Sequence, residues 1–142
     1  MEPALLGLIL DSSVIIEAER NSQSVEQLLK HVRQLFGEVE IALCPVTAAE
    51  LAHGVYRANT LLVRQRRRAF LDELKRHVPV HPLTEETGEI VGQISGEQAA
   101  KGIKLPFDDL AIGAAALEQG YAVATLNVRH FEKIPGLVVK RM

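Results

Sequence analysis

Four acidic residues of this sequence stand where a bound metal ion could be held. Asp11 ends the apolar run LLGLIL, Glu50 lies in TAAELAHG, and Asp108 and Asp109 open DDLAIGAAAL. Carboxylates held close together repel one another, so such a group requires a cation or raised pKa values. Mg²⁺ and Mn²⁺ prefer oxygen ligands, and Mg²⁺ keeps several waters while it takes one or two carboxylates directly. The acids therefore predict a divalent-metal site.

Two polar residues after a later apolar run extend this group. Thr125 and Asn127 both fall in the segment YAVATLNV. Such residues at a strand end usually form turns, and their oxygens also serve a hydrated cation as ligands or hydrogen-bond partners. Zinc is not indicated, because the histidines follow no zinc-ligand spacing: they are His31, His53, His77, His81 and His130.

Helix capping offers a structural explanation for some of these acids. Thr47 followed by Glu50 has the spacing of a capping box at a helix start. Asp108 suits an N-cap, and Asp109 then falls in the first turn, where the helix dipole favours acids. Capping and metal binding both stay open for Glu50. The apolar stretch after Asp109 predicts a buried helix, and two acids at its start favour a nearby cation.

The elements that must position these residues alternate between short β-rich segments and longer helical ones. Apolar residues at three- and four-residue spacing mark the helices, and Gly37, Gly102 and Gly120 are expected to end three of them. This alternation predicts a three-layer α/β sandwich around a mainly parallel sheet of about five strands. The strands are expected at 5–10, 39–43, 78–81, 121–126 and 137–139.

A parallel sheet explains why Asp11 follows an unbroken apolar run. Both faces of such a sheet are covered, so its strands read as continuous apolar segments, as residues 5–10 do. Ligands of open α/β sheets bind beyond the carboxyl ends of the strands. Asp11, Glu50, Asp108 or Asp109, and Asn127 are all expected at that one edge.

The composition fits a single folded domain over 1–142. Of its 142 residues, 47% are hydrophobic and 24% charged, which is enough for a full core. The single cysteine, Cys44, cannot form an internal disulfide and favours a cytoplasmic location. We expect no membrane association, because no apolar run is long enough to span a bilayer and the N-terminus does not look like a secretory signal.

The order of four segments resembles the PIN domain, and within it the VapC-type ribonuclease toxins of toxin–antitoxin pairs. The segments are LDSSVII, TAAELAHG, FDDLAIGAAAL and TLNVRHFEKIPGL, which together cover residues 8–137. The resemblance implies hydrolysis of RNA phosphodiester bonds with Mg²⁺, for which Mn²⁺ can substitute. It implies Asp11, Glu50 and Asp109 as the catalytic metal-site carboxylates. Asp108 is then left with a capping or peripheral role.

Ser13 resembles the family's hydroxyl residue just after the first acid, although Ser12 or Ser13 would also serve to cap a helix. The chain departs from many relatives in the last motif, where Asn127 and His130 stand at positions that often carry a fourth acid. An amide binds a divalent cation less well than a carboxylate, so one firm metal position is expected rather than two.

The resemblance also implies three partners: RNA, a small antitoxin protein and a second copy of the chain. An apolar helix face formed by Ala48, Leu51, Ala52 and Val55 is the expected dimer surface. The formal net charge of −2 gives no general support for RNA binding. Local contacts are expected from Arg64 and Arg67, in a basic stretch over 57–77, and from Arg129, which is closer to the acids in sequence.

The remaining arginines of that stretch, Arg66 and Arg68 among them, fit a solvated helix face. Stacking of bases on aromatic rings is expected to contribute little, because the chain has four Phe, two Tyr and no Trp.

Two other functions stay open on the sequence alone. A strand-end aspartate such as Asp11 is the nucleophile of phospho-acceptor and phosphatase α/β domains. Those sites usually need a second close acid and a lysine at the end of a late strand, and no lysine stands there. The missing fourth acid would also fit a non-catalytic module that binds RNA or protein.

Overall fold

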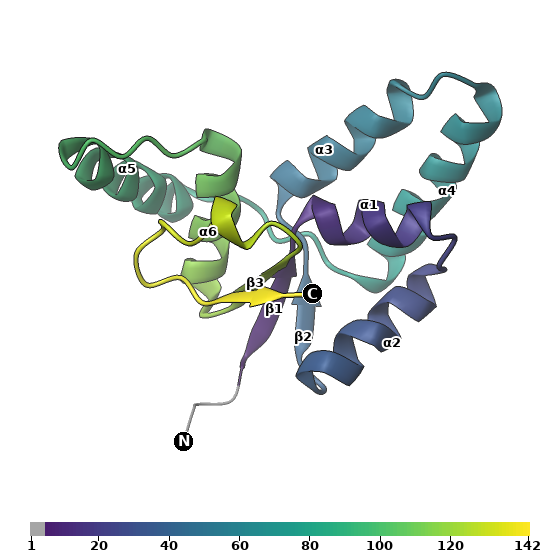
Figure 1. Cartoon of the computed structure of the whole chain (residues 1–142), viewed down its shortest axis with the longest axis horizontal. Coiled ribbons are helices and arrows are strands. Elements are labelled where there is room, and N and C mark those ends of the chain that lie inside the picture. The colour runs from purple at the N-terminus through teal and green to yellow at the C-terminus, as the bar shows by residue number, and fades with distance from the viewer. Residues whose placement is uncertain (1–4) are drawn as a thin grey trace.

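A parallel four-stranded sheet lies at the centre of the chain (Figure 1). The computed structural model describes residues 5–142, so the first residues of the predicted domain lie outside the described part. The strands are β1 (Gly7–Leu10), β2 (Glu40–Ala42), β3 (Ala122–Thr125) and β4 (Val139–Arg141), in the order β2-β1-β3-β4. Leu8 pairs with Ile41 on one side and Ala122 on the other, which brings the carboxyl ends of β2, β1 and β3 together.

Six α-helices of the described residues surround this sheet. Figure 1 shows α1 and α2 together beside one face, α5 and α6 on the other side, and α3 and α4 as a long hairpin. They are α1 (Ser12–Arg20), α2 (Val25–Phe36), α3 (Pro45–Tyr56), α4 (Leu61–His77), α5 (Glu85–Ala100) and α6 (Phe107–Gln119), with a short 3₁₀ helix η1 at Val128–His130. The predicted α/β sandwich with a parallel sheet is confirmed.

The predicted fifth strand at 78–81 is reduced to one parallel bridge between Leu43 and Val80. Leu43 donates to the Pro79 carbonyl at 2.9 Å, and His81 donates to the Leu43 carbonyl at 2.9 Å. Pro79 has no N–H of its own, which limits how far this segment can extend a ladder.

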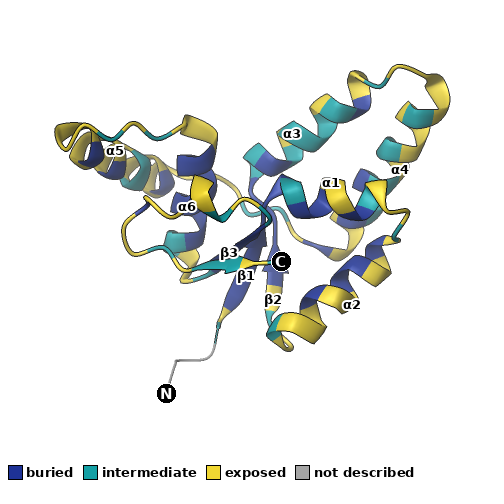
Figure 2. Ribbon diagram, viewed as in Figure 1, coloured by how far each residue is buried: buried dark blue, intermediate teal, exposed yellow. Residues whose placement is uncertain are grey.

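Two apolar clusters cover the two faces of the sheet. Leu8 and Leu10 face a cluster built with α1, α2 and the end of α4, whereas Ile9 between them faces a cluster built with α5 and α6. This alternation follows from the two-residue period of a strand. The inner strands are buried on both faces, as the dark blue ribbons of Figure 2 show. The unbroken apolar run before Asp11 is thereby explained.

The helix starts correct two predictions of capping. Pro45 takes the first position of α3 and Cys44 is its N-cap, so Thr47 lies inside the helix and forms no capping box with Glu50. The Thr47 side chain is buried, and its Oγ1 has no hydrogen-bond partner among the described residues. In α6 the N-cap is Pro106, so Asp108 is not the cap and lies within the first turn.

The predicted helix ends at glycines are confirmed. Gly37 and Gly120 are the C-caps of α2 and α6, and Gly102 follows Lys101, the C-cap of α5. All three glycines have positive φ values. In this conformation a residue with a Cβ atom would be less stable by about 1–2 kcal/mol. No helix within residues 5–142 is long and apolar enough to cross a bilayer.

The apolar face of α3 is not the open surface that the sequence predicted. Val55 is fully buried, and Leu51 packs on the cluster beside α1 and α4. Ala48 and Ala52 are partly buried as well. The face therefore packs inside one copy of the chain, and the homodimer stays a prediction without this support.

Candidate active site

Asp11 lies directly beyond the carboxyl end of β1, with 7% of its surface exposed. Its backbone N–H donates to the Ala124 carbonyl at 3.0 Å, which fixes it against β3. Its carboxylate oxygen Oδ2 accepts from Ser13 Oγ at 2.8 Å and from Thr125 Oγ1 at 2.9 Å. No described residue donates a hydrogen bond to Oδ1. The carboxylate is thus oriented through one oxygen while the other stays available.

The two hydroxyls also connect the ends of β1 and β3. Ser13 Oγ accepts from the backbone N–H of Leu126 at 3.1 Å, and Thr125 Oγ1 accepts from that of Asn127 at 2.9 Å. The hydroxyl oxygens are 3.3 Å apart. Neither Ser12 nor Ser13 caps α1, because Asp11 is its N-cap and no side chain makes a capping bond. Ser13 and Thr125 therefore hold Asp11 in position.

Asp109 lies in the first turn of α6 and is 8% exposed. Burial, and then the charge of Asp108, raise the pKa of Asp109 to about 6, and the charge of Asp11 adds to this shift. His130 acts in the opposite direction, with Nδ1 at 3.8 Å from Asp109 Oδ2. The backbone N–H of Asp109 donates to Asp108 Oδ1 at 3.0 Å. Asp109 is a buried carboxyl that a cation would stabilise as the anion.

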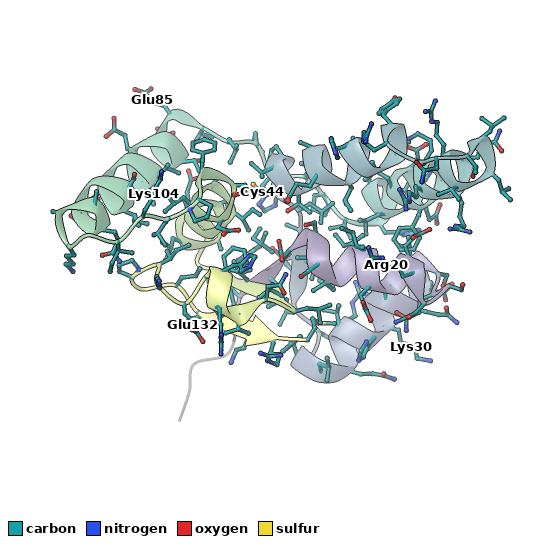
Figure 3. The ribbon with its side chains drawn as sticks, turned by 45° about the horizontal axis from the view of Figure 1, so that its top comes forward. Arg20, Lys30, Cys44, Glu85, Lys104 and Glu132 are labelled. Carbon is teal, nitrogen blue, oxygen red and sulfur yellow. The ribbon has the colours of Figure 1, made fainter. Side chains whose placement is uncertain are left out.

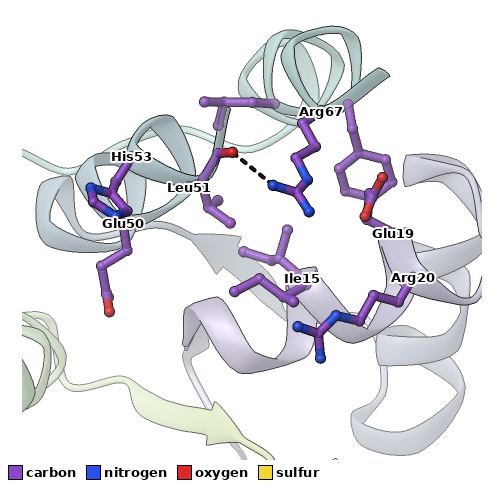
Figure 4. A pocket seen from close by; sticks show the side chains of 11 residues that line it. Ile15, Glu19, Arg20, Glu50, Leu51, His53 and Arg67 are labelled. Atoms are coloured by element: carbon purple, nitrogen blue, oxygen red, sulfur yellow. Dashed lines mark hydrogen bonds between the residues drawn. The ribbon is translucent and has the colours of Figure 1, made fainter. Parts of the chain in front are cut away.

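Glu50 approaches the same edge from α3. Burial, followed by the charges of Asp11 and Asp108, raises its pKa, and a hydrogen bond with Ser12 opposes the shift. Its Oε1 is buried with no partner in the described part of the chain. Figure 4 shows the carboxylate extended away from the α3 ribbon. A buried oxygen without a donor is costly in water-free surroundings, so a hydrated cation would suit it.

The remaining predicted residues lie at the rim. Asp108 and Asn127 are exposed, as is His130. The Asn127 side chain makes no hydrogen bond with a described residue, although its backbone binds Thr125. The structure thus brings together Asp11, Glu50 and Asp109, positions Asp11 through Ser13 and Thr125, and leaves Asp108 and Asn127 at the exposed rim.

These side chains fit a hydrated Mg²⁺ ion better than a fully protein-bound one. Within residues 5–142, no three His, Cys, Asp or Glu side chains converge closely enough to hold one ion by themselves. The charge of Asp11 nevertheless contributes to the raised pKa values of both Glu50 and Asp109. Mg²⁺ satisfies both observations, because it takes one or two carboxylates directly and reaches others through water.

Comparisons with known proteins agree with this geometry. A sequence model of the PIN domain matches residues 8–137. The chain belongs to the PIN domain family. It is 32% identical to ribonuclease VapC1 of Rickettsia felis over 94% of this chain and 95% of that protein. It is 27% identical to the tRNA(fMet)-specific endonuclease VapC of Salmonella typhimurium, covering 96% of this chain and 98% of that protein.

A solved structure shows the same fold. The DNA-bound VapBC of Salmonella typhimurium matches with a TM-score of 0.80 at 25% identity, covering 96% of this chain and 98% of that chain. The resemblance to PIN-domain toxins predicted from the four motifs is thereby confirmed.

The two predicted RNA contacts on α4 form hydrogen bonds within the chain. Arg67 donates to the Gly54 carbonyl at 2.8 Å, shown as the dashed line in Figure 4, and Arg64 donates to the Tyr56 carbonyl at 3.3 Å. Both bonds tie α4 to α3. Arg129 is exposed and directly precedes His130, so it is the predicted RNA contact that lies beside the acids.

A pocket of about 260 Å³ lies between α1, α3 and α4 and reaches Glu50 (Figure 4). Sequence analysis missed it, because its walls come from three helices far apart along the chain. Each helix gave only an amphipathic signal, and no local pattern told which faces would stay open. The lining combines apolar and charged residues: Ile15, Ile16, Glu19, Arg20, Glu50, Leu51, His53, Gly54, Arg67, Phe70 and Leu71.

Proposed function

We propose that this PIN domain is a divalent-metal-dependent endoribonuclease and the toxin of a toxin–antitoxin pair. The observation that carries the proposal is the pair Asp11 and Asp109 at one sheet edge. Asp11 is held by two hydroxyls on one oxygen, and Asp109 is a buried carboxyl with a pKa of about 6. A carboxyl with a raised pKa beside a second buried acid is typical of a catalytic site. The similarity to named ribonucleases supplies the reaction class.

Each acid has a distinct role in the proposed reaction. Asp11 and Asp109 would hold Mg²⁺, or Mn²⁺ in its place. When bound, the ion polarises a phosphate oxygen and lowers the pKa of a coordinated water. Glu50, whose pKa is raised, orients the attacking water and accepts a proton from it. Ser13 and Thr125 keep the Asp11 carboxylate in position through Oδ2.

The proposed substrate is RNA, and the proposed partner is a small antitoxin. One relative is named as an endonuclease specific for tRNA(fMet), and the VapBC structure of Salmonella typhimurium is named for a complex. The pocket beside Glu50 joins an apolar wall to Arg20 and Glu19, which suits an amphipathic protein segment. We propose the cytoplasm as the location, where RNA is present and the Cys44 thiol stays reduced.

The test is cleavage of mixed single-stranded RNA with Mg²⁺, Mn²⁺ or a chelator. We expect cleavage with either metal and none with the chelator. Asp11→Asn keeps the shape and removes the charge, and Asp108→Asn is the matched control at the rim. Calorimetric measurement of Mn²⁺ binding gives a readout that is independent of cleavage. RNA binding without metal-dependent cleavage would instead identify a non-catalytic module.

A further inference from the structure

Two aromatic side chains of this chain are largely exposed. Of its four Phe and two Tyr, Phe107 is 70% exposed and Tyr56 is 65% exposed, whereas the other four are buried or partly buried. Tyr56 ends α3, at the far end of the α3–α4 hairpin (Figure 1). Phe107 is the first residue of α6 and directly precedes Asp108 and Asp109. One exposed aromatic ring therefore lies at the acidic site and the other lies far from it.

The fold alone gives no reason for an exposed ring at this position. Leu110 and Ala111, one turn further along α6, are each only 2% exposed. Figure 2 shows the start of α6 exposed and its middle buried. Phe107 thus stands beyond the end of the core, where its ring gains little free energy from burial.

Free cationic groups accompany the ring. Lys104 is exposed on the segment before α6, and Figure 3 shows it between α5 and α6. Arg129 is exposed beside His130, whose Nδ1 is 3.8 Å from Asp109 Oδ2. Neither Lys104 nor Arg129 forms an ion pair with a described residue. Such cations contact phosphates, which positions a nucleic-acid strand without reading its sequence.

We propose that the Phe107 ring stacks on a nucleobase of the RNA next to the phosphate held at the acids. The inference rests on the proposed ribonuclease function and adds the residue that engages a base. Stacking requires a base that is not already stacked in a duplex, so it selects single-stranded or loop RNA. The sequence predicted little stacking because aromatic residues are few. A single exposed ring that directly precedes Asp108 and Asp109 in α6 is sufficient.

The absence of tryptophan in the chain allows a direct test. Phe107→Trp introduces one indole at the site, and Tyr56→Trp introduces one at the distant position as the matched control. Both are made together with Asp11→Asn, which prevents cleavage. The probe is a single-stranded RNA octanucleotide of mixed sequence, compared with the same oligonucleotide carrying abasic sites. We expect RNA to quench the fluorescence of the F107W protein saturably, with less quenching by abasic RNA and none for the Y56W protein.

Affinity provides the second measurement. Loss of one base–aromatic stack weakens binding by about 1–3 kcal/mol, so Phe107→Ala should raise the Kd for the octanucleotide roughly 5- to 150-fold. Phe107→Tyr should restore binding, and Tyr56→Ala should leave it unchanged. Melting temperatures establish that each variant is folded.

An F107A protein that binds RNA as the wild type does would overturn the inference. If that protein also failed to bind a co-expressed antitoxin, the ring would be assigned to a protein interface instead. Failure of the proposed function would give a different result from failure of this inference, because the wild type itself would then neither bind RNA nor cleave it with metal.

Discussion

The acidic edge of the sheet and the arginine-rich helix α4 both carry many charges, but the acids lie beside like charges, whereas the arginines of α4 have hydrogen-bond or ion-pair partners. Burial and the charges of neighbouring acids raise the pKa values of Glu50 and Asp109, and His130 Nδ1 lies 3.8 Å from Asp109. The α4 arginines are each bonded to acceptors. Arg66 binds Glu19 at 2.9 Å, and Arg68 binds Asp72 at 2.8 Å.

This contrast distinguishes a candidate functional site from a charged, solvated surface. A charge with a partner is already satisfied and contributes modestly to stability. Like charges that are held together at a cost in free energy need a ligand to offset that cost. The acids, not the arginines, are therefore the place to look for chemistry in this PIN domain.

The largest effect is expected from Asp11→Asn. It should reduce metal-dependent RNA cleavage by about a hundred-fold or more, because removal of one preorganised charge at a reacting centre has effects of this order. Asp109→Asn should act in the same way. Both are measured as initial cleavage rates with Mg²⁺ or Mn²⁺.

Melting in chelator provides the control for these two variants. Each removes one of several repelling charges, so the metal-free variants should be as stable as the wild type or more stable. An Asp11→Asn protein that cleaves RNA at nearly the wild-type rate would end the metal-site assignment. Asp108→Asn, at the exposed rim, should lose far less activity.

The hydroxyls behind Asp11 should have the next largest effect. Ser13→Ala or Thr125→Val removes one of the two bonds to Oδ2. Residues that orient a metal ligand typically change metal affinity or activity by about 10–100-fold. We expect weaker Mn²⁺ binding by calorimetry together with slower cleavage. Unchanged metal affinity in both variants would show that the hydroxyls serve only the fold.

The pH dependence of stability distinguishes the two regions further. The pKa of Asp109 is raised from 3.8 to about 6 in the folded chain, so the folded state holds its proton more tightly than the unfolded state. The resulting stabilisation is present at low pH and is lost as the pH rises from about 4 to 6. The metal-free wild type should therefore gain about 1–3 kcal/mol relative to Asp109→Asn between pH 7.5 and pH 4.5.

Chemical denaturation of both proteins at several pH values measures this difference. Glu50 also has a raised pKa and is present in both proteins, so the comparison isolates Asp109. Parallel pH profiles of the two proteins would contradict the assigned shift.

The smallest effect on cleavage is expected from the arginines. Changing Arg66, Arg67 and Arg68 together to Ala should weaken RNA binding modestly and reduce its salt dependence. It should also lower stability by about 1 kcal/mol, since Arg67 loses its bond to the Gly54 carbonyl. Filter binding at several salt concentrations and thermal melting measure the two effects. Complete loss of cleavage by a folded triple variant would place the substrate path along α4.

Much of this protein could be predicted from local sequence. Apolar runs and helical spacing determine the parallel sheet and its helices, because both depend on periods of a few residues. The glycines that end α2 and α6 act through their own backbone conformation. The position of Asp11 at the end of β1 follows from the same local pattern, as does the order of motifs that placed the chain in the PIN family.

Only the tertiary structure decided which partners these residues have. Thr125 bonds to Asp11 across 114 positions of sequence, and no local pattern could pair them. Because Pro45 is the first residue of α3, Thr47 lies inside the helix and does not cap it. The exposure of Phe107 and the pairing of Arg66 with Glu19 depend on where the core ends and which helices meet. Sequence determines local conformation and residue chemistry, whereas burial and partnership arise from packing between distant segments.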